Sequence, residues 1–255
     1  MFKVLICIIA GIGAGVGTGF AGMSAAAVIS PMLIAFLDMD PYLAVGIALA
    51  SDVLASAASA VTYGKNKNLD IKNGLIMMAA VLCFTAVGSF AASIVPKTAM
   101  GNFSVIMTLL LGVKFIVKPV LAPKRRLTEA TTAQKAVRSV LCGSAVGFIC
   151  GFVGAGGGMM MLLVLTSVLG YELKTAVGTS VFIMSITALT GSVSHFVIGG
   201  MPDTEALIIC IVSTLAAAQL SALFANKASP KTLNRITGAI LVALGIAVLV
   251  VNHVS

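Results

Sequence analysis

The stretch "GIGAGVGTGFAG", residues 11–22, places six glycines within twelve positions of an otherwise apolar segment. The apolar run around it, residues 3–36, would be about 51 Å long as one straight helix. A bilayer offers a hydrocarbon core of only about 30 Å. Because each glycine costs a helix about 1 kcal/mol relative to alanine, we expect the run to break near Gly22 and return as a hairpin.

The end of this stretch, Gly17 to Gly22, spells G-x-G-x-x-G, a pattern that binds dinucleotides in soluble proteins. Such a site needs its glycines between a strand and a helix, with an acidic residue about 20 positions further on. Asp38 and Asp40 lie near that distance, but nothing in the sequence alternates strand and helix. We therefore expect no nucleotide cofactor.

Composition places the chain in a membrane. It is 59% hydrophobic and only 9% charged, whereas a soluble domain is typically about 25% charged. Apolar runs near the length that spans a bilayer recur along the whole sequence, which predicts an all-α polytopic membrane protein. Lysines and arginines lie in short loops without interleaved aromatics, so we expect no nucleic-acid partner. Five isolated cysteines indicate neither a metal site nor disulfides.

The sequence contains two copies of one unit. An offset of 132 aligns "GFAGMSAAAVISPML" (19–33) with "GFVGAGGGMMMLLVL" (151–165), and "AVGIA" (44–48) with "AVGTS" (176–180). We assign residues 1–118 to a first repeat, 119–136 to a charged cytoplasmic linker and 137–255 to a second repeat. The second glycine cluster, Gly154–Gly158, predicts a second break.

Charge supports a hairpin in each repeat. With a re-entrant hairpin and three transmembrane helices per repeat, fourteen of the sixteen lysines and arginines fall on one side, and Lys3 and Lys97 are the exceptions. Eight simple spans would divide the same residues eleven to five. The positive-inside rule thus favours hairpins, with both termini outside. An odd number of spans per repeat inserts the two copies in opposite orientation, as in inverted-repeat transporters.

The two breaks predict a binding site near the membrane midplane. Free backbone N–H groups at a helix N-terminus attract anions. We expect such groups from Gly22, Met23 and Ser24 in one repeat, and from Gly154, Gly156, Gly157 and Gly158 in the other. The alternative, that the glycines only allow close helix packing, suits the spacing of Gly11, Gly15 and Gly19 and stays open for them.

These motifs, the G-F-x-G turn opening each repeat, the small-residue run after it and the A-V-G-T-S block, resemble the sulfite exporter TauE/SafE family of bacterial membrane transporters. The resemblance covers nearly the whole chain. It implies a protein of the bacterial inner (plasma) membrane that moves small sulfur-containing anions such as sulfite, sulfoacetate or related organosulfonates. Thr179 and Ser180, in the repeated block, become candidate substrate contacts. The first repeat departs from the pattern at Ala25–Ala27 and at Ile47–Ala48.

Asp52 is the one acidic residue deep in a predicted span. A charged carboxylate there costs roughly 3 kcal/mol even on insertion scales, so it should face the protein interior. Two interpretations stay open: a proton carrier, or a protonated carboxyl group that hydrogen-bonds a neighbouring helix. Serines and threonines in the same spans are either donors to an anion or ordinary interhelical contacts.

Together these features predict a secondary transporter of a small anion. An inside-negative potential contributes about 2.3 kcal/mol per charge for each 100 mV, which favours export. A proton-coupled importer and an anion channel are the alternatives. The sequence has no H-E-x-x-H motif and no paired intramembrane aspartates, so we expect no enzyme. The expected partners are the bilayer and the anion, and the oligomeric state stays open.

Overall fold

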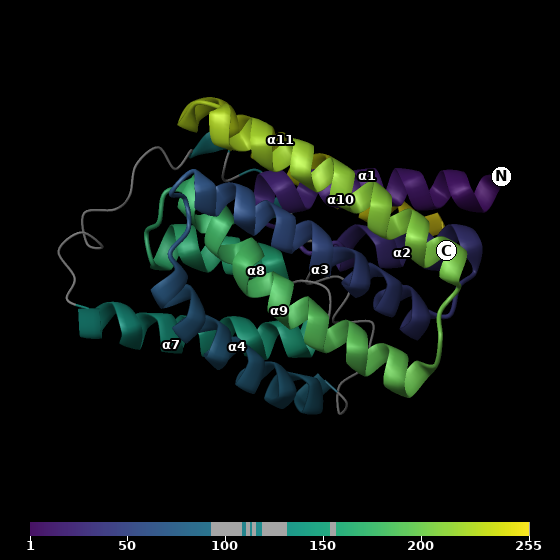
Figure 1. The fold of residues 1–255 in the computed structure, drawn as a ribbon, viewed down its shortest axis with the longest axis horizontal. Helices are drawn as coiled ribbons and strands as arrows, with labels where there is room; N and C mark the ends of the chain where they lie inside the picture. Colours follow the sequence, from purple (N-terminus) through teal and green to yellow (C-terminus); the bar gives the residue numbers. More distant parts are fainter. Residues whose placement is uncertain (93–108, 111–112, 114–115, 119–131, 154–156, 255) are drawn as a thin grey trace.

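The computed structural model describes residues 1–92, 109–110, 113, 116–118, 132–153 and 157–254. Every regular element in these ranges is helical, which confirms the all-α prediction (Figure 1). The elements in chain order are α1 (Phe2–Ala21), α2 (Ala26–Leu37), α3 (Pro41–Lys65), α4 (Ile71–Ala92), α7 (Thr132–Val153), α8 (Gly157–Leu163), the π-helix η1 (Val164–Val168), α9 (Leu173–Gly199), α10 (Thr204–Lys227) and α11 (Pro230–Val254).

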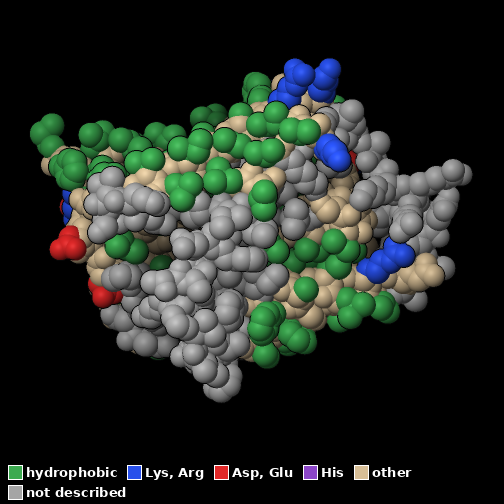
Figure 2. Space-filling model, turned by 180° about the vertical axis from the view of Figure 1, so that it is seen from behind, with side chains coloured by type: hydrophobic (Ala, Val, Ile, Leu, Met, Phe, Trp, Pro, Cys, Tyr) green, Lys and Arg blue, Asp and Glu red, His purple; other side chains and the backbone are tan. Residues whose placement is uncertain are grey.

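Four helices in the described ranges are long and apolar enough to cross a membrane. They are Phe2–Ala21, Leu43–Lys65, Leu173–Val197 and Thr204–Lys227, and shorter apolar helices accompany them. Large apolar side chains cover much of the outer surface, as a lipid-facing surface requires (Figure 2). Examples are Leu5, Ile12, Leu54, Val212 and Leu220.

The first apolar run breaks where its glycines predict. Helix α1 ends at Ala21, and Gly22 follows with φ 59° in the left-handed region, which glycine adopts without steric cost. Helix α2 begins at Ala26 and packs back against both α1 and α3. The predicted break at Gly22 is therefore confirmed in the first repeat, although α1 by itself is long enough to cross a membrane.

The second break falls only partly on described residues. Helix α7 ends at Val153 and α8 begins at Gly157, and residues 154–156 lie outside the described ranges. Most of the expected linker, 119–136, also lies outside them, as do most of residues 93–118.

Glycine faces bring the helices of the two halves together. In α1, Gly11, Gly15 and Gly19 lie directly against α10, where any side chain would collide with its backbone or its serines. In α7, Gly143 and Gly147 lie in the same way against α4. The interpretation that Gly11, Gly15 and Gly19 allow close helix packing is thus confirmed, in addition to the break at Gly22.

Helices α3 and α9 pack together in antiparallel fashion. Gly46, early in α3, faces His195 late in α9, whereas Tyr63, late in α3, faces Gly178 early in α9. These helices lie within the bundle between the α1–α10 and α4–α7 pairs (Figure 1).

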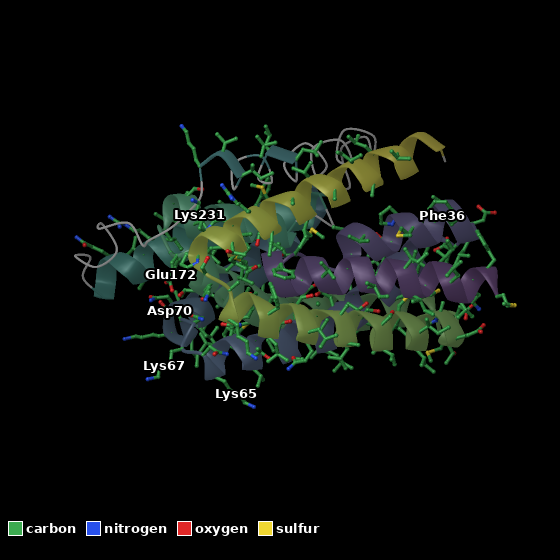
Figure 3. All side chains as sticks on the ribbon, turned by 90° about the horizontal axis from the view of Figure 1, so that it is seen from above. Phe36, Lys65, Lys67, Asp70, Glu172 and Lys231 are labelled. Carbon is green, nitrogen blue, oxygen red and sulfur yellow. The ribbon has the colours of Figure 1, made fainter. Side chains whose placement is uncertain are left out.

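The two ends of the bundle differ in the charged residues that they carry. Both chain ends lie at one end (Figure 1), where Lys3 pairs with Asp203 and Glu205. This contact lowers the pKa of the Asp203 carboxyl group, first through the hydrogen bond from Lys3. The opposite end carries the basic residues, among them Lys65, Lys67 and Lys231 (Figures 2 and 3). We call it the basic end.

Gly15→Ala tests the contact between α1 and α10. The new Cβ would lie 2.4 Å from the Thr214 carbonyl oxygen and 2.8 Å from the Ala218 nitrogen. Backbone atoms cannot yield without separating the two helices, so we expect the free energy of unfolding to fall by about 1–3 kcal/mol. Thermal unfolding in detergent, followed by circular dichroism, measures the change.

Gly64→Ala is the matched control, because the nearest atom to its new Cβ is the Leu69 Cδ2 at 3.4 Å. Alanine is the better helix former by about 1 kcal/mol, so this variant should match or exceed the parent in stability. Equal losses in both variants would contradict close packing at Gly15.

Candidate functional site

Four carbonyl groups around the end of α1 accept a hydrogen bond from a hydroxyl group. Tyr63 of α3 donates to the Gly19 oxygen at 2.8 Å, and Thr237 of α11 donates to the Phe20 oxygen at 3.1 Å. Ser180 of α9 donates to the Gly22 oxygen at 3.0 Å, and Thr18 of α1 donates to the Met23 oxygen at 2.9 Å. These four hydroxyl groups supply partners inside the protein to carbonyl groups around the break, as membrane depth demands.

Asp52 lies at the other side of the same break, where α2 begins. Its side chain is fully buried. Ser24 donates to Oδ2 at 2.8 Å, Ser56 donates to Oδ1 at 2.7 Å, and the backbone N–H of Ala25 is a third donor. The carboxyl group therefore sits on the first turn of α2, at the positive end of the helix dipole.

This geometry differs from the expectation of bare amide groups at the break. The Ala25 N–H faces Asp52, and the Ala26 N–H donates to the Ser24 hydroxyl at 3.3 Å. A buried carboxyl group needs donors and a helix N-terminus needs acceptors, so each satisfies the other. Any anion that uses this turn has to share it with Asp52 or replace it.

Gly158 brings the second repeat against the first break. A Cβ at this position would lie 2.6 Å from the Ser24 nitrogen and 2.7 Å from the Gly22 oxygen. Met184 of α9 approaches the same point through its sulfur. Gly22, Met23, Ser24, Gly158 and Ser180 thus form one buried cluster beside Asp52, which we call the break cluster.

Other candidates lie elsewhere or outside the described residues. Gly154 and Gly156 belong to the undescribed ranges, and Gly157 opens α8. The Thr179 hydroxyl accepts the Asp70 N–H at 3.2 Å, so it faces the α3–α4 connection rather than the break cluster. Neighbouring helical residues point about 100° apart, which is why Thr179 and Ser180 diverge.

Asp70, next to Thr179, organises a separate network at the basic end. It accepts hydrogen bonds from Tyr171 at 2.7 Å and from the Asn73 side chain at 2.7 Å. Burial, and then the Asp70 carboxylate, raises the pKa of Tyr171 well above its ordinary value. The Tyr171 hydroxyl therefore stays protonated and holds the loop before α9 against the start of α4.

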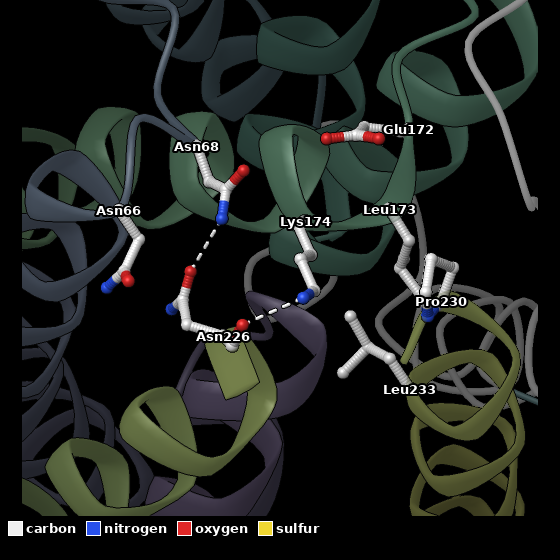
Figure 4. A pocket seen from close by; sticks show the side chains of 8 residues that line it. All are labelled: Asn66, Asn68, Glu172, Leu173, Lys174, Asn226, Pro230 and Leu233. Atoms are coloured by element: carbon white, nitrogen blue, oxygen red, sulfur yellow. Dashed lines mark hydrogen bonds between the residues drawn. The ribbon is translucent and has the colours of Figure 1, made fainter. Parts of the chain in front are cut away.

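A polar pocket of about 340 Å³ opens at the basic end (Figure 4). Asn68 donates to the Asn226 side chain at 2.7 Å, and Lys174 donates to the Asn226 carbonyl oxygen at 2.8 Å. These contacts join the ends of α3, α9 and α10. The pocket is lined by Asn66, Asn68, Glu172, Leu173, Lys174, Asn226, Pro230 and Leu233.

Sequence reasoning missed the pocket and several partners of the break. Tyr63 and Thr237 carry no motif, and each lies far from Gly22 in sequence. Serine and threonine content in the spans did indicate hydrogen bonding between helices, but it could not identify the acceptors. Among the described residues, no three His, Cys, Asp or Glu side chains are grouped to hold a metal ion.

A helical bundle with apolar outer surfaces, a broken helix in its interior and a buried carboxyl group at the break is the architecture of a multi-pass membrane transporter. Residues 7–248 match the family model described as sulfite exporter TauE/SafE. The chain belongs to this family.

Two relatives of this chain are named as probable membrane transporter proteins. The probable membrane transporter protein YunE of Bacillus subtilis is 25% identical over 94% of this chain and 95% of its own length. The probable membrane transporter protein YdhB of the same species is 24% identical over 83% of this chain and 86% of its own. The chain is therefore a membrane transporter of the TauE/SafE family.

Gly158→Ala tests the contact between the two halves at the break cluster. Its Cβ would press on the Ser24 nitrogen and the Gly22 oxygen, so we expect a loss of about 1–3 kcal/mol in unfolding free energy. Thermal unfolding in detergent measures it. Gly74→Ala, whose Cβ meets only side-chain atoms of Phe182 and Thr179 at 3.3 Å or more, is the control. A Gly158→Ala variant as stable as this control would show that the two halves do not touch there.

Proposed function

We propose that this protein is a secondary transporter that exports a small sulfur-containing anion, such as sulfite, sulfoacetate or a related organosulfonate. The family assignment supports transport of this class of solute. The observation that carries the proposal is the break cluster, where an interrupted helix, an approaching glycine of the other half and a buried carboxyl group meet. We propose Gly22, Met23, Ser24, Gly158 and Ser180 as its substrate contacts, joined by Gly154, Gly156 and Gly157. Thr179, which faces the α3–α4 connection, is not among them.

The packing pattern supports inverted repeats. The glycine face of α1 lies on α10, and that of α7 lies on α4. By sequence offset, α7 corresponds to α1 and α10 corresponds to α4. An exchange of equivalent helices, with an antiparallel α3–α9 pair between them, is what a two-fold axis in the membrane plane produces. We therefore propose that residues 1–118 and 137–255 are related in this way.

The distribution of charge supports one orientation. Lysines gather at the end opposite to both termini (Figures 2 and 3). By the positive-inside rule, the basic end faces the cytoplasm and both termini face outward, in the bacterial plasma membrane. Net outward movement of an anion then follows the membrane potential.

Asp52 supports a second candidate, proton-coupled uptake. Its carboxyl group occupies the α2 N-terminus that an anionic substrate would use. Two negative charges there would repel each other, and a proton on Asp52 removes that repulsion. A carrier that binds proton and anion together can use an inward proton gradient. The relatives are named as transporters, and we propose no catalytic role.

Anion binding is tested by thermal stabilisation of the purified protein in detergent. A ligand at 100 times its Kd stabilises the folded state by about 2.7 kcal/mol. We expect sulfite or sulfoacetate to raise the melting temperature, and taurine and chloride to leave it unchanged. Stabilisation by none of sulfite, thiosulfate and sulfoacetate would contradict the proposed substrate class.

Asp52→Asn tests proton coupling. Asparagine keeps the size of the side chain but carries no titratable proton, so we expect flux of labelled anion into proteoliposomes to lose its pH dependence. Anion affinity, from the melting shift, should be retained. Asp38→Asn, at an exposed position after α2 where asparagine tolerates the left-handed backbone, is the control. An unchanged pH profile in Asp52→Asn would contradict a role for Asp52 in proton transfer.

A proton gradient imposed across the proteoliposome membrane separates the two functions. Proton-coupled uptake predicts that the anion accumulates along the gradient, and export driven by the membrane potential predicts that it does not.

A further inference from the structure

One face of α3 carries a continuous series of polar side chains. Asp52, Ser56, Ser59 and Tyr63 follow one another at intervals of four, three and four residues, which places them on one side of the helix. All four are fully buried. The series extends about 16 Å along the helix, from the break cluster toward the basic end. We call these four residues the α3 polar file.

Ser59 is the unusual member of the file. Its hydroxyl oxygen is buried and has no hydrogen-bond partner among the described residues. Buried hydroxyl groups in proteins are almost always paired, and a water molecule commonly supplies the missing partner. Ser56, one turn away, already donates to Asp52 at 2.7 Å. A water at Ser59 would lie next along the file.

Tyr63 connects the file to the basic end. Its hydroxyl donates to the Gly19 oxygen, and its lone pairs can accept a further hydrogen bond. The Tyr63 Cβ and the Asn68 carbonyl oxygen both face Gly178, and Asn68 lines the pocket at the basic end. The Asn68 N–H also donates to the Tyr63 carbonyl oxygen at 2.9 Å, so the last residue of the file is bonded to a residue that lines the polar pocket.

The other direction along α3 is apolar. On the same face, the positions before Asp52 are Ala48 and Val45, which offer neither donor nor acceptor. A proton leaving Asp52 along α3 thus finds polar groups only toward the basic end.

We propose that the α3 polar file is the proton route between Asp52 and the basic-end pocket, with water bound at Ser59. The Ser56 hydroxyl gives its proton to the Asp52 carboxylate and takes another from the water at Ser59. That water regains a proton from water that enters from the pocket along Tyr63. The Ser56 hydroxyl and the water at Ser59 thus each lose one proton and gain one, and Asp52 ends protonated. The inference deepens the proposed function, because it rests on proton exchange at Asp52.

Ionisable groups on the helices packed against α3 are engaged away from Asp52. The groups that donate hydrogen bonds to Asp52 are Ser24, Ser56 and the Ala25 N–H, none of which is ionisable near neutral pH. Helix α2 has no ionisable side chain. Lys3 pairs with Asp203 and Glu205, Cys210 contacts the Cys7 carbonyl oxygen, and Lys174 binds Asn226. The remaining groups on these helices are Cys7 of α1, beside Cys210, His195 of α9, facing Gly46, and Lys227 at the end of α10.

The route is tested by a pH jump on purified protein without substrate, followed by infrared spectroscopy. The carboxyl band of Asp52 is assigned by its loss in Asp52→Asn. We expect Ser59→Ala to slow the change of this band by at least about tenfold, equivalent to about 1.4 kcal/mol in the barrier. Ser59→Ala removes an unpaired hydroxyl and should fold; Ser59→Cys, nearly isosteric and a weak hydrogen-bonding group, is a second variant.

Ser51→Ala is the matched control, since Ser51 is equally buried on α3 but donates to the Ile47 oxygen of its own helix. Its band should change at the parent rate. Equal rates in Ser59→Ala, Ser51→Ala and the parent would overturn the route while leaving Asp52 as a proton carrier. The absence of any Asp52 band change in the parent would instead overturn proton exchange itself, and the route with it.

Discussion

Hydrogen bonding of an interrupted backbone is the constraint on which this structure depends. Backbone N–H and C=O groups at membrane depth must find partners inside the protein. The carbonyl groups that end α1 receive hydroxyl groups from α1, α3, α9 and α11, and the amides that begin α2 face Asp52 and Ser24. Helices remote in sequence therefore have to converge on residues 19–26. The arrangement of the bundle around its centre follows from that requirement.

Sequence alone predicted the break, because residues 3–36 are too long for one span and glycine weakens the helix at a definite place. It also indicated that Gly11, Gly15 and Gly19 allow another helix to pack closely. In the structure these three glycines contact α10, and Gly22 forms the break. The partner of that face could not be predicted, since spacing on one helix carries no information about the helix lying against it. For the same reason Thr237 could not be connected with Phe20, and a motif containing Thr179 and Ser180 did not show which one points to the break.

Asp52 shows how local chemistry altered the expected site. The sequence indicated an acidic residue in a span and a helix N-terminus at the break, but not whether the two lie in contact. In the structure the carboxyl group satisfies the helix N-terminus directly. An ionised Asp52 occupies the α2 N-terminus and repels a second anion, whereas a protonated Asp52 does not repel it. This is why proton binding and anion binding are linked in the proposed function.

The contact of α1 with α10 has a mechanical consequence. A glycine on each of three successive turns of α1 brings the backbones of the two helices into direct contact. No flexible side chain lies at these three positions to adjust if one helix shifts along the other. Because Gly11, Gly15 and Gly19 meet Ser213, Ala217 and Ser221 in that order, the two helices run parallel. The Gly22 turn therefore lies close to the end of α10 at which Asn226 holds Asn68 and Lys174. A rotation of the two helices that loosens the turn must also strain the Asn226 contacts, which couples the break directly to the pocket at the basic end.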